Sequence, residues 1–95
     1  METNISLSKE AYQLLRDDEA RAYYSELKME GYLLFISKKQ YAKIANCSLS
    51  TVDNNIKRGY GLPNYKKIGI AKNAKVIFSL IDVANYFASE TIKTA

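Results

Sequence analysis

The sequence predicts a mainly α-helical fold with a small antiparallel β-hairpin. Along most of the chain, capping residues precede stretches whose apolar residues have helical spacing. Two short runs rich in β-branched and aromatic residues follow a cluster of helix breakers near the middle. At 95 residues, of which 47% are hydrophobic, the chain has the size and composition of one small folded domain.

The first stretch with helical spacing covers residues 9–16. Its apolar residues share one face, and either Ser6 or Ser8 is expected to cap its N-terminus. Residues 1–7 show no such pattern and are expected to be frayed.

Asp17 is the expected cap of a second helix, which extends to about residue 30 and carries acids in its first turn. Gly31 can adopt the left-handed conformation that closes a helix. Tyrosines in this region are interpreted as core or dimer-interface residues. The expected apolar stripe consists of Ala20, Tyr23, Tyr24 and Leu27.

The apolar run 33–36 has two interpretations, a buried strand or an extended lead-in to the next element. Ser37 and Gln40 then fit a capping box, in which each side chain bonds the other residue's backbone. A helix over about 38–46 should follow. Its expected buried residues are Tyr41, Ala42 and Ala45.

Only Asn46 and Cys47 separate this helix from the next one. Asn tolerates the left-handed conformation that so tight a turn requires. Cys47 is interpreted as a small apolar plug between the helices. Ser48 should cap the second helix, which ends near Gly59. Its expected inward residues are Val52 and Ile56.

Helix breakers then introduce a hairpin with strands at 65–68 and 75–78 and a tip at 69–74. Ser79 and Asp82 form another cap pattern, which opens a last helix of about ten residues. Residues 91–95 are expected to form a loose tail. The core-facing residues expected in the last helix are Val83, Tyr86 and Phe87.

Charge is divided unevenly along the chain. Residues 1–30 carry four bases and seven acids, a net charge of −3, whereas residues 31–95 carry ten bases and three acids, a net charge of +7. Nine of those bases lie within residues 37–78, where Asp53 is the only acid. Such a block favours a polyanionic partner, and nucleic acid is the interpretation preferred over a lysine-coated soluble surface.

Composition also excludes several functions. The chain has no histidine and a single cysteine, so it lacks imidazole-based catalysis, an internal disulfide and a cysteine-rich metal site. No apolar run approaches the ~20 residues of a membrane-spanning helix, and no signal-peptide pattern opens the chain. We therefore expect a cytoplasmic, non-enzymatic protein without cofactor or metal and without a membrane partner.

Two short helices joined by a sharp turn and followed by a lysine-bearing hairpin make a winged helix-turn-helix with an N-terminal helical extension. The first helix braces the second, whose exposed face can enter a major groove ~12 Å wide. The hairpin would then reach the neighbouring backbone or the minor groove.

The segment 41–52, with the sequence YAKIANCSLSTV, resembles the helix-turn-helix of the MerR-like superfamily, especially its small excisionase and AlpA-type members. Further runs up to about residue 88 follow the same pattern in order. The resemblance implies a winged helix-turn-helix domain over 33–90, with 1–32 as an extension that has no counterpart. Asn55 departs from the pattern because an apolar residue is frequent there.

The resemblance also implies the contact residues. Asn54 is the first candidate for a base edge, since an amide can pair bidentately with adenine, and Asp53 would accept from a cytosine amino group or repel wrong registers. The implied base contacts are Leu49, Ser50, Asp53 and Asn54. The implied phosphate contacts are Ser48, Thr51, Lys38, Lys39, Lys43, Lys57 and Arg58. The implied wing contacts are Lys66, Lys67, Lys72 and Lys75.

The expected function is sequence-specific binding of double-stranded DNA, as a transcriptional regulator of the MerR-like type. One alternative is an excisionase, or recombination directionality factor, of a mobile element. Another is a protein-interaction module that uses the acidic N-terminal helices. The sequence leaves open a homodimer or a DNA-assisted oligomer, and either an integrase or RNA polymerase as a protein partner.

Overall fold

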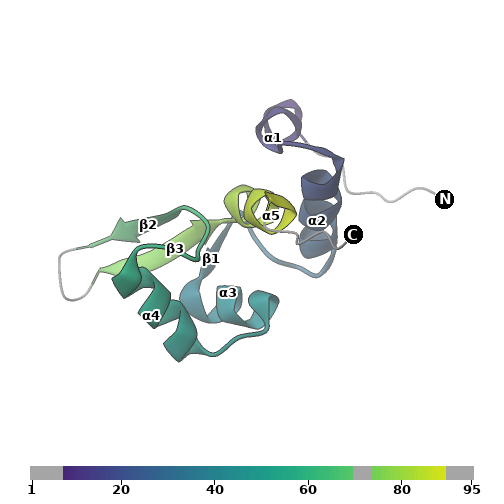
Figure 1. Cartoon of the computed structure of the whole chain (residues 1–95). Coiled ribbons are helices and arrows are strands. Elements are labelled where there is room, and N and C mark those ends of the chain that lie inside the picture. Colours follow the sequence, from purple (N-terminus) through teal and green to yellow (C-terminus); the bar gives the residue numbers. More distant parts are fainter. Residues whose placement is uncertain (1–7, 70–73, 90–95) are drawn as a thin grey trace, which may run out of the picture.

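The structure is a computed structural model that describes residues 8–69 and 74–89. These residues are mainly helical and include a three-stranded antiparallel sheet, which confirms the expected mainly helical fold with a small antiparallel sheet and adds one strand to the expected hairpin (Figure 1). In chain order the elements are α1 (Lys9–Leu14), α2 (Asp18–Met29), β1 (Phe35–Ser37), α3 (Lys38–Ala45), α4 (Leu49–Arg58), β2 (Tyr65–Ile68), β3 (Lys75–Ser79) and α5 (Leu80–Ser89).

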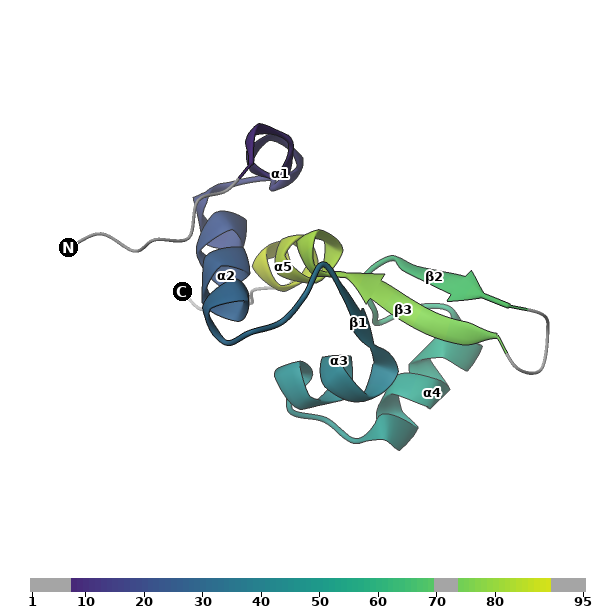
Figure 2. The same cartoon turned by 180° about the vertical axis from the view of Figure 1, so that it is seen from behind.

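The two views of the ribbon show how the elements are layered. Helices α3 and α4 lie on one side of the sheet, α5 continues from the end of β3, and α2 stands beside α5 with α1 at its far end (Figures 1 and 2). The described helices α2 and α5 pack against each other. The hairpin β2–β3 extends away from this packed region (Figure 2).

The sheet has the order β1-β3-β2, with both outer strands antiparallel to β3. The register places Ile36 and Tyr65 on either side of Phe78, so these three side chains share the face that packs on the helices. Phe78 is fully buried, and its ring stacks on that of Tyr41 with 4.6 Å between centroids. Burial raises the pKa of the Tyr41 phenol well above its ordinary value.

The apolar run 33–36 differs from the expected buried strand. Only Ile36 is buried, whereas Leu33, Leu34 and Phe35 are 72%, 50% and 44% exposed. Two of them precede β1, and alternation along the strand directs Phe35 away from the face that buries Ile36. The extended lead-in therefore describes residues 33 and 34, Phe35 begins strand β1, and Ile36 is the only buried residue of the run.

Helix α1 is shorter than expected. Ser8 caps it by accepting a hydrogen bond from the Ala11 N–H at 3.0 Å, while Ser6, residues 1–7 and the expected tail 91–95 lie outside the described residues. The helix ends at Leu14 because Leu15 adopts an extended conformation, with φ −81° and ψ 125°. That conformation directs the chain toward α2 and leaves Leu15 buried.

Helix α2 begins where expected, with Asp17 accepting from the Ala20 N–H at 2.9 Å. Gly31 has a φ of +99°, and its N–H donates to the Lys28 carbonyl at 3.0 Å, which closes the helix as expected. Tyr23 differs from the expected stripe because it is exposed and its hydroxyl bonds Glu19.

The N-terminal helices share the core of the remaining chain. Leu15, Ala20 and Tyr24 belong to the same buried cluster as Val83 of α5. The Asn85 side chain adds two hydrogen bonds to the link between α1 and α2: its amide nitrogen donates to the Leu14 carbonyl at 3.0 Å, and its oxygen accepts from the Arg16 N–H at 2.9 Å. The described part of the extension is therefore packed against α5 rather than projecting from the fold.

Candidate nucleic-acid interface

Local signals in the sequence fix the start of α3. The capping box is confirmed: the Gln40 N–H donates to Ser37 Oγ at 3.1 Å, and the Ser37 N–H donates to Gln40 Oε1 at 2.9 Å. Tyr41 and Ala42 are buried as expected, whereas Ala45 is half-buried. The helix thus packs one face against the core. Its first turn, with Lys38 and Lys39, lies beside the β2–β3 hairpin.

The turn between α3 and α4 has the expected left-handed residue. Asn46 has φ 57° and ψ 47°, and the Cys47 N–H donates to the Ala42 carbonyl at 2.9 Å. Ser48 caps α4 by accepting from the Thr51 N–H at 3.1 Å, and the two hydroxyls lie 3.0 Å apart. The expectation that Cys47 fills the space between the two helices is wrong, because residues 46–48 are all exposed to solvent.

Helix α4 separates its residues into a packed face and an exposed polar face. Val52 is fully buried and Ile56 packs against the core, as the spacing predicts. Ser50, Asn54 and Lys57 are exposed, and their three- and four-residue spacing places them on one side of the helix. Two of the four base contacts implied by the resemblance therefore stand on the open face of α4.

Asn55 links the end of α4 to the following loop. Its Nδ2 donates to the Gly61 carbonyl at 3.4 Å, and its Oδ1 accepts from Arg58 Nη2 at 2.6 Å. A Cβ at Gly61, whose φ is +83°, would lie 3.3 Å from Asn55 Nδ2. Asn55, where the family pattern often has an apolar residue, thus makes polar contacts within the chain. One of its partners is Arg58, whose guanidinium also lies 5.5 Å from the centre of the Tyr60 ring.

A groove of about 240 Å³ lies where the start of α3, the start of α4 and the hairpin meet. Three lysines from two elements border it, and Leu49 provides an apolar wall. It therefore joins the recognition face predicted for α4 to the part of the predicted wing nearest its tip. Its lining residues are Ser37, Lys38, Lys39, Leu49, Ala74, Lys75 and Val76.

Lys38 and Asp53 form an ion pair beside this groove. Lys38 Nζ donates to Asp53 Oδ1 at 2.7 Å, and the two side chains are 36% and 44% exposed. A residue implied to contact phosphate is thus bound to a residue implied to contact a base. Neither the charge balance nor the motif signalled this pair, because it joins residues on two helices.

The remaining cations do not all face the groove. Lys43 lies with Glu26 and Glu30 around a separate concavity between α2 and α3. Lys66 and Lys67 are adjacent on β2 and so project from opposite faces, with Lys67 opposite Val76. Lys72, at the expected tip of the wing, lies outside the described residues.

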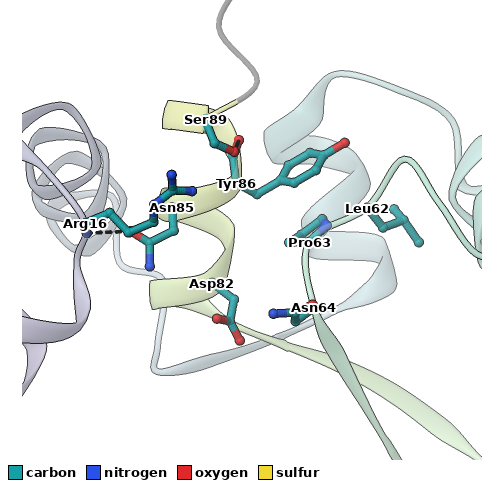
Figure 3. Close-up of a pocket in the computed structure, with 8 residues that line it drawn as sticks. All are labelled: Arg16, Leu62, Pro63, Asn64, Asp82, Asn85, Tyr86 and Ser89. Atoms are coloured by element: carbon teal, nitrogen blue, oxygen red, sulfur yellow. Dashed lines mark hydrogen bonds between the residues drawn. The ribbon is translucent and has the colours of Figure 1, made fainter.

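A second concavity, of about 230 Å³, separates the N-terminal segment from the loop after α4 (Figure 3). Asp82 of α5 points toward Asn64, and Tyr86 extends toward Pro63 (Figure 3). Burial raises the pKa of the Asp82 carboxyl, and the positive charge of Lys66 opposes that shift. This concavity shares no lining residue with the lysine-bordered groove.

Other classes of site are not found in the described ranges 8–69 and 74–89. No group of three or more His, Cys, Asp or Glu residues there could hold a metal ion. In the same ranges, every helix is too short or too polar to cross a membrane.

No protein-family model, no curated protein and no solved structure matched the chain. The resemblance to the MerR-like superfamily therefore rests on its motif residues alone.

Proposed function

We propose that this protein binds double-stranded DNA in a sequence-directed manner as a winged helix-turn-helix. Helix α4 would enter the major groove, and the β2–β3 hairpin would act as the wing. The observation that carries the proposal is the exposed polar face of α4, with Ser50 and Asn54, beside a groove bordered by Lys38, Lys39 and Lys75. Polar side chains on a helix next to clustered cations combine base reading with backbone attraction.

Base reading would fall to the first turns of α4. The Asn54 amide can donate to and accept from adenine, and the Ser50 hydroxyl can bond either a base or a phosphate. Leu49 is 43% exposed, and its side chain could lie against a thymine methyl group. These three residues stand on the part of the helix that faces outward or borders the groove.

Backbone attraction would come from cations on either side of this face. Lys39, Lys57 and Lys75 are exposed. Each lysine that contacts a phosphate releases counterions and makes binding weaker at higher salt. The N-terminus of α4, which follows the cap Ser48, adds backbone N–H groups that have no acceptor within the helix and favour an anion.

The resemblance assigns this activity to a transcriptional regulator, with an excisionase as the alternative within DNA binding. The arrangement of binding sites separates the two roles. A single site or a palindrome fits a regulator, whereas repeated sites fit a factor that assembles along DNA with an integrase.

Protein binding is the second candidate function, and one observation favours it. Leu33, Leu34 and Phe35 form a run of large apolar side chains that the fold leaves exposed. Exposed apolar surface of this kind is typical of interaction sites. Replacing all three with serine would abolish partner capture under this alternative and would leave DNA affinity unchanged under the main proposal.

Fluorescence anisotropy with a labelled random-sequence duplex tests the proposal. The double variant Lys39→Gln, Lys75→Gln should weaken binding and reduce the slope of log affinity against log salt by about two units. The matched control Lys9→Gln, Lys28→Gln removes the same charge from α1 and α2. Equal losses in both variants, or no binding by the unmodified protein at low salt, would contradict the proposed interface.

A further inference from the structure

We propose that Asp53 is a specificity-determining residue that suppresses binding to DNA offering only backbone contacts. This inference rests on the proposed DNA-binding function. In the free protein, Asp53 holds Lys38 in an ion pair and so withholds one cation from the phosphates. A duplex that supplies a donor to the Asp53 carboxylate would release Lys38, whereas other duplexes would not.

The position of the pair supports this role. Lys38 is the first residue of α3 and borders the lysine groove, and Asp53 precedes the exposed Asn54 on α4. The pair therefore lies between the predicted base-reading face and the predicted backbone-binding groove. Asp53 is also the only acid among residues 37–78, so no other carboxylate of that block could have the same effect.

On a duplex of arbitrary sequence, phosphates compete with Asp53 for Lys38. If Lys38 stays paired, one phosphate contact is lost. If Lys38 moves to a phosphate, the Asp53 carboxylate remains close to a polyanion without a counter-charge, and the two negative charges repel. In either state, contacts with the DNA phosphates contribute less binding free energy than the number of lysines alone would predict.

On a suitable sequence, the same carboxylate gains a partner. The N4 amino group of cytosine donates in the major groove, and Asp is one of the side chains that accept from it. That hydrogen bond would replace the bond from Lys38, which could then contact a phosphate. A repulsive element that only the correct partner neutralises is a general route to specificity.

A purely structural role makes the opposite prediction. The 2.7 Å pair joins α3 to α4, so it could serve only to hold the two helices together. Removing the Asp53 charge would then lower the melting temperature and weaken binding to every duplex by the same factor. Asn preserves the shape of Asp and can still accept from Lys38, which makes Asp53→Asn the least disruptive probe of the charge.

The decisive experiment measures the anisotropy of two labelled duplexes, one of random sequence and one enriched by the unmodified protein, across a salt series. For Asp53→Asn we expect affinity for the random duplex to rise about fivefold or more at ~0.1 M salt. The slope of log affinity against log salt should become steeper by about 0.9. Affinity for the enriched duplex should stay constant or fall. The control Asp18→Asn removes an acid from the 3.2 Å pair with Arg21 on α2, and it should affect both duplexes alike.

Lys38→Gln completes the test. In the otherwise unmodified protein it should weaken random-duplex binding, because the Asp53 carboxylate then lies near the phosphates without a counter-charge. In the Asp53→Asn background it should remove the gained slope. A fall in random-duplex affinity on Asp53→Asn, or an equal rise for both duplexes, would overturn the role of Asp53 alone. Absence of salt-dependent binding in every protein tested would overturn the DNA-binding function together with it.

Discussion

The acidic N-terminal helices and the basic segment from α3 to β3 place their charges differently with respect to packing. Residues 1–30 have a net charge of −3, and the helices within them bury Leu15, Ala20 and Tyr24 in the core shared with α5. Residues 37–78 carry nine bases and one acid, and α4 leaves a polar face exposed beside the lysine groove. The difference indicates that the first region mainly completes the fold, whereas the second carries the exposed surface that we propose binds DNA.

The largest expected effect tests whether the N-terminal region completes the fold. Leu15 is 1% exposed and its neighbour Leu14 is 60% exposed. Leu15→Ala should reduce the free energy of unfolding by about 2–5 kcal/mol, whereas Leu14→Ala should change it by less than about 0.5 kcal/mol. Urea unfolding followed by circular dichroism measures both. A separate early transition, or similar costs for the two variants, would show that the N-terminal helices fold apart from the remaining chain.

The next largest effect is expected at Asn54, on the exposed face of α4 that we propose reads the bases. Asn54→Ala should weaken binding to the preferred duplex by roughly 1–3 kcal/mol and relax selection at one or two base pairs. Gln13→Ala, an exposed amide on α1, should leave affinity and selection unchanged. Competition between the preferred and random duplexes gives both quantities. Equal weakening on both duplexes would mean that Asn54 contacts the backbone and that α4 is oriented differently.

The smallest expected effect concerns Asp82, which lines the concavity between the N-terminal segment and the loop after α4 (Figure 3). Burial raises the pKa of this carboxyl in the folded state, so folding favours its protonated form. That contribution is complete below the ordinary pKa of an aspartate and is lost as pH rises through the raised value. Asp82→Asn should therefore remove a small decline in melting temperature as pH increases through this acidic window. An unchanged pH profile would contradict the burial of the charge.

Most helix starts and ends were predictable because their signals are local, and the end of α1 at Leu14 is the exception. Ser37 with Gln40, the left-handed Asn46 and the Ser48 cap each act within about one turn, and all three are present in the structure. The expected cap at Ser79 is present as well, since its hydroxyl accepts from the Asp82 N–H at 3.2 Å.

Features that depend on distant pairing were not predictable in the same way. The pairing of β1 with β3, which sets Ile36 opposite Phe78, decides that Ile36 is buried and Phe35 is not, and hydrophobic periodicity carries no information about that pairing. The candidate interface shows the same limit. The motif singled out the groove lysines, but the pairing of Lys38 with Asp53 and the placement of Lys43 beside Glu26 depend on how the helices pack.

Selection from a pool of random duplexes at two salt concentrations, with sequencing of the retained fraction, tests the central claim most directly. A sequence-directed DNA-binding protein should enrich a defined motif, and retention should fall steeply at the higher salt concentration. Repeated motifs would favour the excisionase role, and a single site or palindrome would favour a regulator. No retention at low salt, or salt-dependent retention without any enriched motif, would contradict the account.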